Sequence, residues 1–170
     1  MFIVQAANNY IYLGFSVFPL KENTKDSQVV SSWINDATRD REKVALWWQK
    51  NPNYNLGVKT GNGYIVIDVD NKNGKNGSKV IEKFLDEFPK TRIVRTPNDG
   101  IHIYYKVDRE IRCKVNLYEG IDIRGDGGYV VGVGSVINGK EYKMDGGARI
   151  AEANEAVYRF LEGGYKLEKE

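Results

Sequence analysis

The sequence predicts an α+β or mixed α/β fold, on two observations. Apolar residues alternate strictly with other residues in short runs such as YIVIDVD (64–70) and IHIYY (101–105), which is typical of strands. Segments with helical periodicity are mixed among these runs. The 170 residues, 41% of them hydrophobic, suffice for a buried core, and no repeat or low-complexity linker divides them. We therefore expect a single domain over residues 1–170.

The N-terminal third reads as helix, strand, loop and helix. Apolar positions such as Ile3, Ala6 and Tyr10 predict a helix over residues 2–13, ending at Gly14. FSVFPL (15–20) predicts a short strand, and residues 21–38 are polar and irregular. The next segment, RDREKVALWWQKNP (39–52), predicts a second helix that ends before Pro52.

The middle of the chain predicts four strands and a helix. NLGVKT (55–60) and YIVIDVD (64–70) read as strands joined by a hairpin-like turn at Gly61-Asn62-Gly63. TRIVRT (91–96) and IHIYYKV (101–107) read as a second pair across the turn Pro97-Asn98-Asp99-Gly100. Between the pairs, residues 77–88 predict a helix capped by Ser78, and its inward residues are Val80, Ile81, Phe84 and Leu85.

The last third predicts glycine-rich β structure followed by a closing helix. The β structure spans residues 119–144, and ARIAEANEAVYRFLEGG predicts the closing helix over residues 148–163.

Composition excludes several classes of protein. The net charge is only +2, so a polyanionic partner must be bound by a local patch. Cys113 is the one cysteine, which excludes an internal disulfide and a multi-cysteine zinc site and fits a reducing compartment. The N-terminal residues do not resemble a signal peptide, and no run approaches 18 apolar residues. We expect a cytoplasmic protein with no membrane contact.

Two acidic residues end a strand that is otherwise built for burial. Side chains alternate along a strand, so Asp68 and Asp70 lie on one face and Ile65, Ile67 and Val69 on the other. Two like charges this close repel each other and require a compensating cation. Lys72 or Lys75 could supply it, and a divalent ion such as Mg²⁺ or Mn²⁺ suits carboxylates better.

Two later strands repeat this division of faces. His102 shares a face with Tyr104, and Asp122 shares one with Arg124. If the three strands are neighbours, one face collects Asp68, Asp70, His102, Asp122 and Arg124, the composition of a two-metal site for a phosphorylated substrate. Each residue taken alone has a plainer interpretation. The aspartates could cap turns, His102 could be structural, and Asp122 with Arg124 could be a surface ion pair.

The ordered set of motifs resembles a known family. GFSVFPL, YIVIDVD, VRTPNDGIHIYY and GIDIRGDGGYVV together are similar to the bifunctional DNA primase/polymerase (prim-pol) domain of the archaeo-eukaryotic primase superfamily, from about residue 14 to 142. The resemblance implies an RRM-like catalytic sheet joined to an N-terminal α/β half, with an active-site cleft between them.

The resemblance also implies roles for individual residues. Asp68, Asp70 and Asp122 match the acids that hold two Mg²⁺ or Mn²⁺ ions and are catalytic, together with His102. His102 and Gly100 match the motif that contacts the incoming nucleotide, and Arg95, Arg124 and Ser135 fall in matched segments as further nucleotide contacts. Some relatives carry a zinc-binding stem, which one cysteine and one histidine cannot support here.

The implied activity is that of a DNA-directed nucleotidyltransferase of the primase type. A 3′-hydroxyl of a primer or of a first nucleotide, held on a single-stranded DNA template, attacks the α-phosphate of an incoming NTP or dNTP and pyrophosphate leaves. The setting implied is replication of a phage, plasmid or other mobile element. A replicative helicase is an expected partner in relatives. Lys72, Lys75 and Lys79 are candidate DNA contacts, or equally a solvated loop.

Two alternatives stay open. The domain could be a non-catalytic module that binds nucleotide or single-stranded DNA, or a catalytic core that is inactive without a missing helicase or accessory domain. A metal-dependent nuclease or a nicking replication initiator is disfavoured. The nicking class typically needs a histidine pair plus a tyrosine, and this chain has one histidine.

Overall fold

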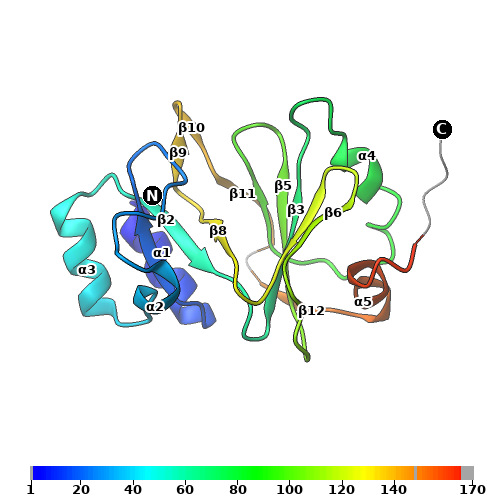
Figure 1. Ribbon diagram of the computed structural model, residues 1–170, viewed down its shortest axis with the longest axis horizontal. Helices are drawn as coiled ribbons and strands as arrows, with labels where there is room; N and C mark the ends of the chain where they lie inside the picture. The colour runs from blue at the N-terminus through cyan, green and yellow to red at the C-terminus, as the bar shows by residue number, and fades with distance from the viewer. Residues whose placement is uncertain (1, 148, 166–170) are drawn as a thin grey trace. The chain divides into compact units, whose positions relative to one another are not determined.

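The computed structural model describes residues 2–147 and 149–165 (Figure 1). The helices in these ranges are α1 (Ile3–Leu13), α2 (Trp33–Asp36), α3 (Arg41–Lys50), α4 (Gly77–Ile81) and α5 (Glu155–Leu161). The strands are β1 (Val17–Leu20), β2 (Asn55–Lys59), β3 (Tyr64–Val69), β4 (Ile93–Arg95), β5 (Ile101–Lys106), β6 (Lys114–Tyr118), β7 (Ile121–Arg124), β8 (Tyr129–Val131), β9 (Val136–Ile137), β10 (Lys140–Glu141), β11 (Lys143–Gly146) and β12 (Ala151–Glu152). The expected α+β class is confirmed. No helix in the described residues is long and apolar enough to cross a bilayer.

The chain divides into two compact units. Unit 1 comprises residues 1–60 and 127–143, and unit 2 comprises residues 61–126 and 144–170. Unit 1 contains a sheet in the order β1-β2-β8, and its helices α1 and α3 contact each other and the strands β2 and β1 respectively. Asp40 caps α3 by accepting hydrogen bonds from the amides of Glu42 and Lys43, and Gly14 ends α1 in the left-handed conformation, as predicted.

Unit 2 is built on a larger sheet. Its strand order is β11-β4-β5-β3-β7-β6, and β12 pairs in parallel with the end of β5. The central strand β3 pairs antiparallel with β5 on one side and with β7 on the other. The three strands that the sequence marks as two-faced are therefore neighbours, and they form the middle of this sheet.

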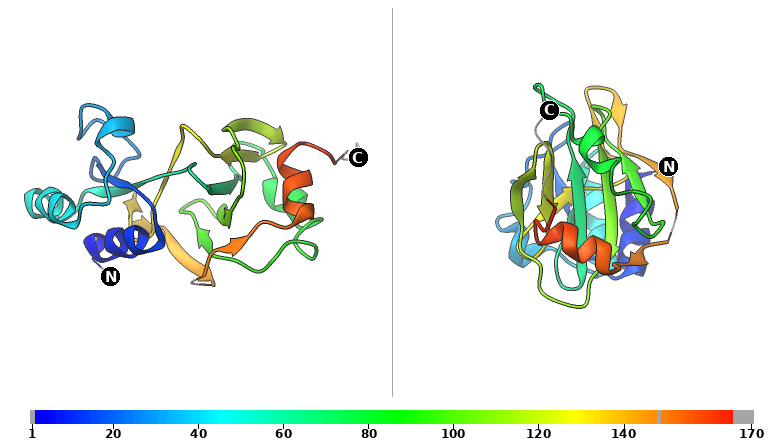
Figure 2. Two further views of the ribbon diagram at one scale, coloured as in Figure 1. Left: turned by 90° about the horizontal axis from the view of Figure 1, so that it is seen from below. Right: turned by 90° about the vertical axis from the view of Figure 1, so that its right-hand side faces the viewer.

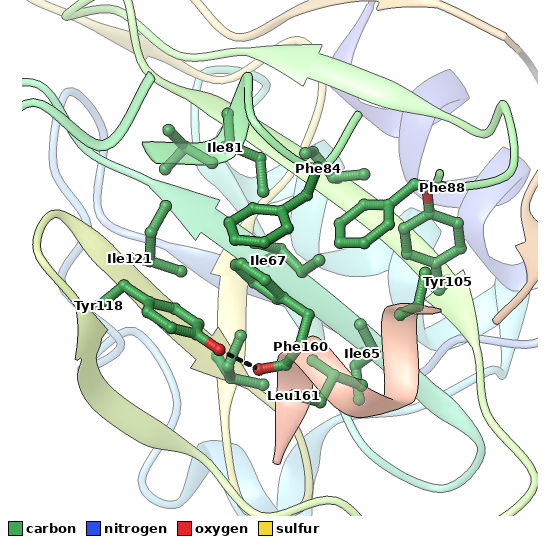
Figure 3. Close-up of a cluster of buried hydrophobic side chains, with 14 of the residues drawn as sticks. Ile65, Ile67, Ile81, Phe84, Phe88, Tyr105, Tyr118, Ile121, Phe160 and Leu161 are labelled. Carbon is green, nitrogen blue, oxygen red and sulfur yellow. Dashed lines mark hydrogen bonds between the residues drawn. The ribbon is translucent and has the colours of Figure 1, made fainter. Parts of the chain in front are cut away.

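One face of this sheet carries the core of unit 2. Ile65, Ile67 and Ile121 lie on it at 0–1% exposure and pack against aromatic side chains from residues 77–88, which we call the α4 segment, and from α5 (Figure 3). Phe160 of α5 is fully buried and meets the rings of Phe84, Phe88 and Tyr118. Figure 2 shows α5 lying across the strands.

Two buried tyrosines satisfy their hydroxyls within this core. The Tyr118 hydroxyl donates to the Phe160 carbonyl at 3.1 Å, and the Tyr105 hydroxyl donates to the Pro89 carbonyl at 2.6 Å. Burial raises the pKa of both phenols above its usual value, because the phenolate would lose its hydration. Both rings therefore remain neutral donors that fix the ends of α5 and of the α4 segment.

The predicted hairpin at Gly61-Asn62-Gly63 is wrong. β2 belongs to the sheet of unit 1 and β3 to the sheet of unit 2, so the two strands do not pair. The turn instead carries the chain from one unit to the other. Asp126 holds it, since its Oδ1 accepts from the Asn62 amide at 2.9 Å. The turn itself was predicted correctly, but the strands on either side of it pair with other strands, β2 with β1 and β8 and β3 with β5 and β7.

Two predicted helices are shorter than expected. α4 ends at Ile81, and residues 82–88 continue as turns and a bend that bury Phe84 and Phe88 but leave Leu85 at 37% exposure. Asn76, not Ser78, caps α4 by accepting from the Lys79 amide. The closing helix predicted from residue 148 begins at Glu155. Residues 151–152 form β12, because pairing with β5 outweighs their helical propensity, and residue 148 lies outside the described residues.

Candidate nucleotide and metal site

Three side chains meet in one cross-strand row on the second face of the unit 2 sheet. Asp68 of β3 lies directly opposite His102 of β5 and, on its other side, directly opposite Asp122 of β7. Residues in such register on one face lie close enough to interact. We call His102, Asp68 and Asp122 the acidic row. Its three residues were predicted to meet, and the register confirms that they do.

The carboxylates of the acidic row share one guanidinium. Arg124 Nη2 lies 3.2 Å from Asp122 Oδ2, and Arg124 Nε lies 3.9 Å from Asp68 Oδ2. On the other side of Asp68, His102 Nε2 lies 3.4 Å from Oδ1. Asp68 and Asp122 are 26% and 24% exposed, so both are accessible to solvent ions, whereas His102 is 7% exposed. Arg124 therefore supplies a positive charge between Asp68 and Asp122. The sequence predicted a compensating cation for Asp68 and Asp70, and named Lys72, Lys75 or a divalent ion for that role.

Asp122 is also held by an irregularity in the neighbouring strand. The pairing of β6 with β7 shifts register between Lys114 and Tyr118, which indicates a bulge. Asn116 lies in that bulge at a φ of 56°, and its amide donates to Asp122 Oδ1 at 2.7 Å. One oxygen of Asp122 thus faces the β6 backbone, and the other faces Arg124.

Asp70 lies one step beyond β3 and serves a turn. Its amide donates to the Gly120 carbonyl at 2.8 Å, which extends the ladder with β7. Its Oδ1 accepts from the Lys72 amide at 2.9 Å, and its Oδ2 lies 4.0 Å from Lys75 Nζ. The turn-capping interpretation therefore describes Asp70 correctly in this structure. Lys72 and Lys75 lie on this loop, and Lys79 lies within α4.

Glycines flank Asp70 because larger residues would not fit. A Cβ at Gly120, which has a φ of +74°, would lie 2.7 Å from the Asp70 carbonyl oxygen. A Cβ at Gly100 would collide with the Val69 carbonyl oxygen. Gly100, predicted as a nucleotide contact, thus has a packing reason to be small next to the acidic end of β3.

Asn71 joins this end of β3 to two other segments, and sequence reasoning missed it. Its Nδ2 donates to Ser78 Oγ at 2.7 Å and to the Asp99 carbonyl at 2.9 Å, while its Oδ1 accepts from the Ser78 amide at 3.0 Å. It links the Asp70 turn to α4 and to the turn that precedes His102. Only its position directly after the Asp-x-Asp motif could have indicated this role.

Arg92 is a second residue that sequence reasoning missed. It lies two residues before Val94, the partner of His102 in register, so it shares the face of the acidic row. It is 4% exposed, and its guanidinium carbon lies 5.6 Å from the ring centroid of Tyr104. The alternation of TRIVRT could have found it, because Arg92 and Val94 share one face.

Arg95 and Ser135 were predicted as nucleotide contacts, and neither belongs to the acidic row. Arg95 pairs in register with Ile101, which places it on the face that carries the core, and its Nη2 lies 2.8 Å from Asp145 Oδ2. Ser135 belongs to unit 1, where it is fully buried and its Oγ accepts from the Leu56 amide at 2.9 Å. Both nucleotide-binding roles stay predictions.

The acidic row contains two of the three predicted metal ligands, Asp68 and Asp122, and these two fit a divalent cation. Asp68 and Asp122 offer carboxylate oxygens, the ligands that Mg²⁺ and Mn²⁺ prefer, and a cation of this chain already lies between them. Within residues 2–147 and 149–165, no group of three or more His, Cys, Asp or Glu side chains is gathered closely enough to hold a metal ion. A site made of one or two carboxylates completed by substrate phosphates is nevertheless the usual arrangement for Mg²⁺.

Comparison with protein families identifies the chain. Residues 7–156 match the family described as bifunctional DNA primase/polymerase, N-terminal. The match covers most of the 170 residues, so the chain belongs to the prim-pol family. Comparison with curated proteins gives no match. Family membership associates the chain with DNA primase/polymerase activity and with DNA replication. The cleft expected between two halves stays a prediction.

Proposed function

We propose that this domain joins nucleoside triphosphates on a single-stranded DNA template, as a primase/polymerase whose reaction is centred on the acidic row. The observation that carries the proposal is the direct juxtaposition of Asp68 and Asp122 on adjacent strands, beside His102 and around Arg124. Family membership supplies the class of reaction. We expect NTPs or dNTPs as substrates and a phage, plasmid or other mobile element as the setting.

Each residue of the row has a role in this proposal. Asp68 and Asp122 would hold a divalent cation, with Asp70 as the third predicted ligand and a second ion expected from the family. When bound, Mg²⁺ or Mn²⁺ would lower the pKa of the attacking 3′-hydroxyl and neutralise charge on the departing pyrophosphate. His102 and Arg124 would orient the triphosphate by contacting its oxygens. Such chemistry is mostly positioning and electrostatics, so no side-chain nucleophile is needed.

Template binding would rely on local positive charge. Lys72, Lys75 and Lys79 follow the acidic end of β3, and Lys75 lies 4.0 Å from Asp70. We propose that they contact phosphates of the DNA strand, with an affinity that falls as salt rises. A replicative helicase is the protein partner that we propose for this activity.

The test is nucleotide incorporation on single-stranded DNA. Primed and unprimed templates are incubated with Mg²⁺ or Mn²⁺ and with NTPs or dNTPs, for the wild type and for Asp68→Asn and Asp122→Asn. Asparagine keeps the shape of each side chain and still offers the Asn116 amide an acceptor, so the fold is retained while the charge is lost. Asp86→Ala, on an exposed turn of the same unit, is the matched control.

Metal-dependent product from the wild type and from the control, lost in both asparagine variants, would support the proposal. Product from unprimed template would add priming to extension. Full activity in both asparagine variants would rule out the acidic row as the reaction centre.

A second candidate is a non-catalytic module that binds nucleotide or single-stranded DNA. It is favoured by the fact that, among the described residues, no three potential ligands are gathered around a metal position. It predicts nucleotide or DNA binding without product in any lane. A catalytic core that needs a missing helicase or accessory domain likewise predicts no product until that domain is added.

A further inference from the structure

The guanidinium of Arg124 lies against the oxygens that a cation would use. Arg124 contacts Oδ2 of Asp122 at 3.2 Å and Oδ2 of Asp68 at 3.9 Å. The other oxygen of Asp122 accepts from the Asn116 amide, and the other oxygen of Asp68 lies 3.4 Å from His102 Nε2. A cation that binds both acids through their Oδ2 atoms would therefore compete with Arg124 for these oxygens.

Arg124 can either pair with the two carboxylates or be displaced from them by a metal ion. Arg124 is 32% exposed and its two partners are about a quarter exposed, so these ion pairs are screened by solvent and weak enough to exchange. Two carboxylates carry two negative charges and Arg124 neutralises one of them, so a divalent cation is the better counter-ion. Once displaced, the guanidinium keeps its charge and needs a new anionic partner.

We propose that Arg124 is the counter-ion of the metal-free site and that metal binding releases it toward the triphosphate. This inference rests on the proposed function, because it takes the acidic row as the metal and nucleotide site. Arg124 is then a positioning residue that couples the two ligands. It opposes metal binding in the absence of nucleotide and favours nucleotide binding once the metal is present.

The proposal predicts opposite effects of one substitution. In Arg124→Gln, the acids lose their resident cation, so Mn²⁺ alone should bind about tenfold more tightly. A nucleoside triphosphate in the presence of Mg²⁺ should bind about tenfold more weakly, because a charged contact to phosphate is lost. Arg124→Lys keeps the charge but loses the planar fork, so both affinities should lie between those of the wild type and Arg124→Gln.

The first measurement is a titration of Mn²⁺ followed by electron paramagnetic resonance, which detects free Mn²⁺ without any catalytic turnover. It compares the wild type, Arg124→Gln and Arg124→Lys with Asp122→Asn and with Arg149→Gln, an exposed arginine of the same unit. We expect tighter binding in Arg124→Gln, binding unchanged within twofold in Arg149→Gln, and loss of this site in Asp122→Asn.

The second measurement separates displacement from a general effect of charge. In ¹⁵N spectra, the Arg124 Nε–H signal is assigned by its absence in Arg124→Gln. Addition of Mg²⁺ without nucleotide should shift it, because the guanidinium leaves the carboxylates, while the Arg149 signal stays in place. A shift of the Arg124 Nε–H signal that saturates as the site measured with Mn²⁺ becomes filled would support the proposal.

The outcomes distinguish this inference from the proposed function. If Mn²⁺ binds to the wild type and is lost in Asp122→Asn, but Arg124→Gln does not tighten it and the Nε–H signal does not move, the site stands and the role of Arg124 is overturned. If neither the wild type nor Arg124→Gln binds Mn²⁺, both the inference and the metal site of the proposed function fail.

Discussion

The two faces of the unit 2 sheet carry very different side chains, although they are formed by adjacent residues of the same strands. Ile67 pairs with Ile103 and Ile123, and the next row is Asp68 with His102 and Asp122. The first row is buried at 0–1% exposure under α5 and the α4 segment, whereas Asp68 and Asp122 are each about one-quarter exposed. A slip of one residue in register would exchange the rows, placing carboxylates in the core. The core face thus locks the register that brings the acidic row together.

The comparison separates stability from function. Burial of the isoleucine row and its aromatic cover stabilises the fold. Partly exposed ion pairs such as those of Arg124 contribute about 1 kcal/mol or less, so the acidic row is not needed to hold the sheet. Substitutions on the two faces should therefore differ in which property they change.

The largest expected effect is on the acidic face. Asp68→Ala combined with Asp70→Ala should lower nucleotide incorporation on the order of 10³-fold or more, because two of the three predicted metal ligands are removed. The free energy of unfolding should change by no more than about 1 kcal/mol, since mutual repulsion of the acids is relieved as their ion pairs are lost. Incorporation assays and urea denaturation of the same preparation measure both. Retained activity would remove these acids from the reaction.

Next in size is the effect of truncating the core face. Phe160→Ala deletes a fully buried ring that meets Phe84, Phe88 and Tyr118, so it should lower the free energy of unfolding by about 3–5 kcal/mol. Phe2→Ala, at a ring that is 75% exposed, is the matched control and should change it by less than about 0.5 kcal/mol. If Phe160→Ala and the double aspartate variant lowered the free energy of unfolding equally, the distinction between the two faces would be wrong.

The smallest expected effect is on the turn that follows β3. Asn71→Ala removes three hydrogen bonds that tie the end of β3 to α4 and to the turn before His102, so it should cost about 1–2 kcal/mol of stability. Asn98→Ala, at an exposed position of that turn, is the control. Thermal unfolding of the two variants measures the difference. An unchanged midpoint for Asn71→Ala would show that the turn is held by its backbone alone.

Some features of the fold follow from local pattern. Alternation in three short runs correctly divides Asp68, His102 and Asp122 from their aliphatic neighbours, because strand geometry leaves only two faces. The Pro97–Gly100 turn joins β4 to β5 as predicted, since turn chemistry acts over a few residues.

Other predictions failed because these features depend on contacts with residues far away in the sequence. The turn at Gly61–Gly63 is correctly read, but β2 and β3 enter different sheets. Residues 151–152 pair with β5 instead of extending α5, and the α4 segment unwinds after Ile81 so that Phe84 and Phe88 reach the core. Propensity alone does not contain these competing contacts.

The sequence by itself determined the α+β class, the family and the residues of the acidic row, because each rests on order and alternation along the chain. Only the tertiary structure decided how they are used. The strand order sets Asp68 between His102 and Asp122, the β6 bulge takes one oxygen of Asp122, and Arg124 takes the other. It also places Arg95 on the core face and buries Ser135 in unit 1. Such choices follow from pairing between strands far apart in sequence, which no local pattern encodes.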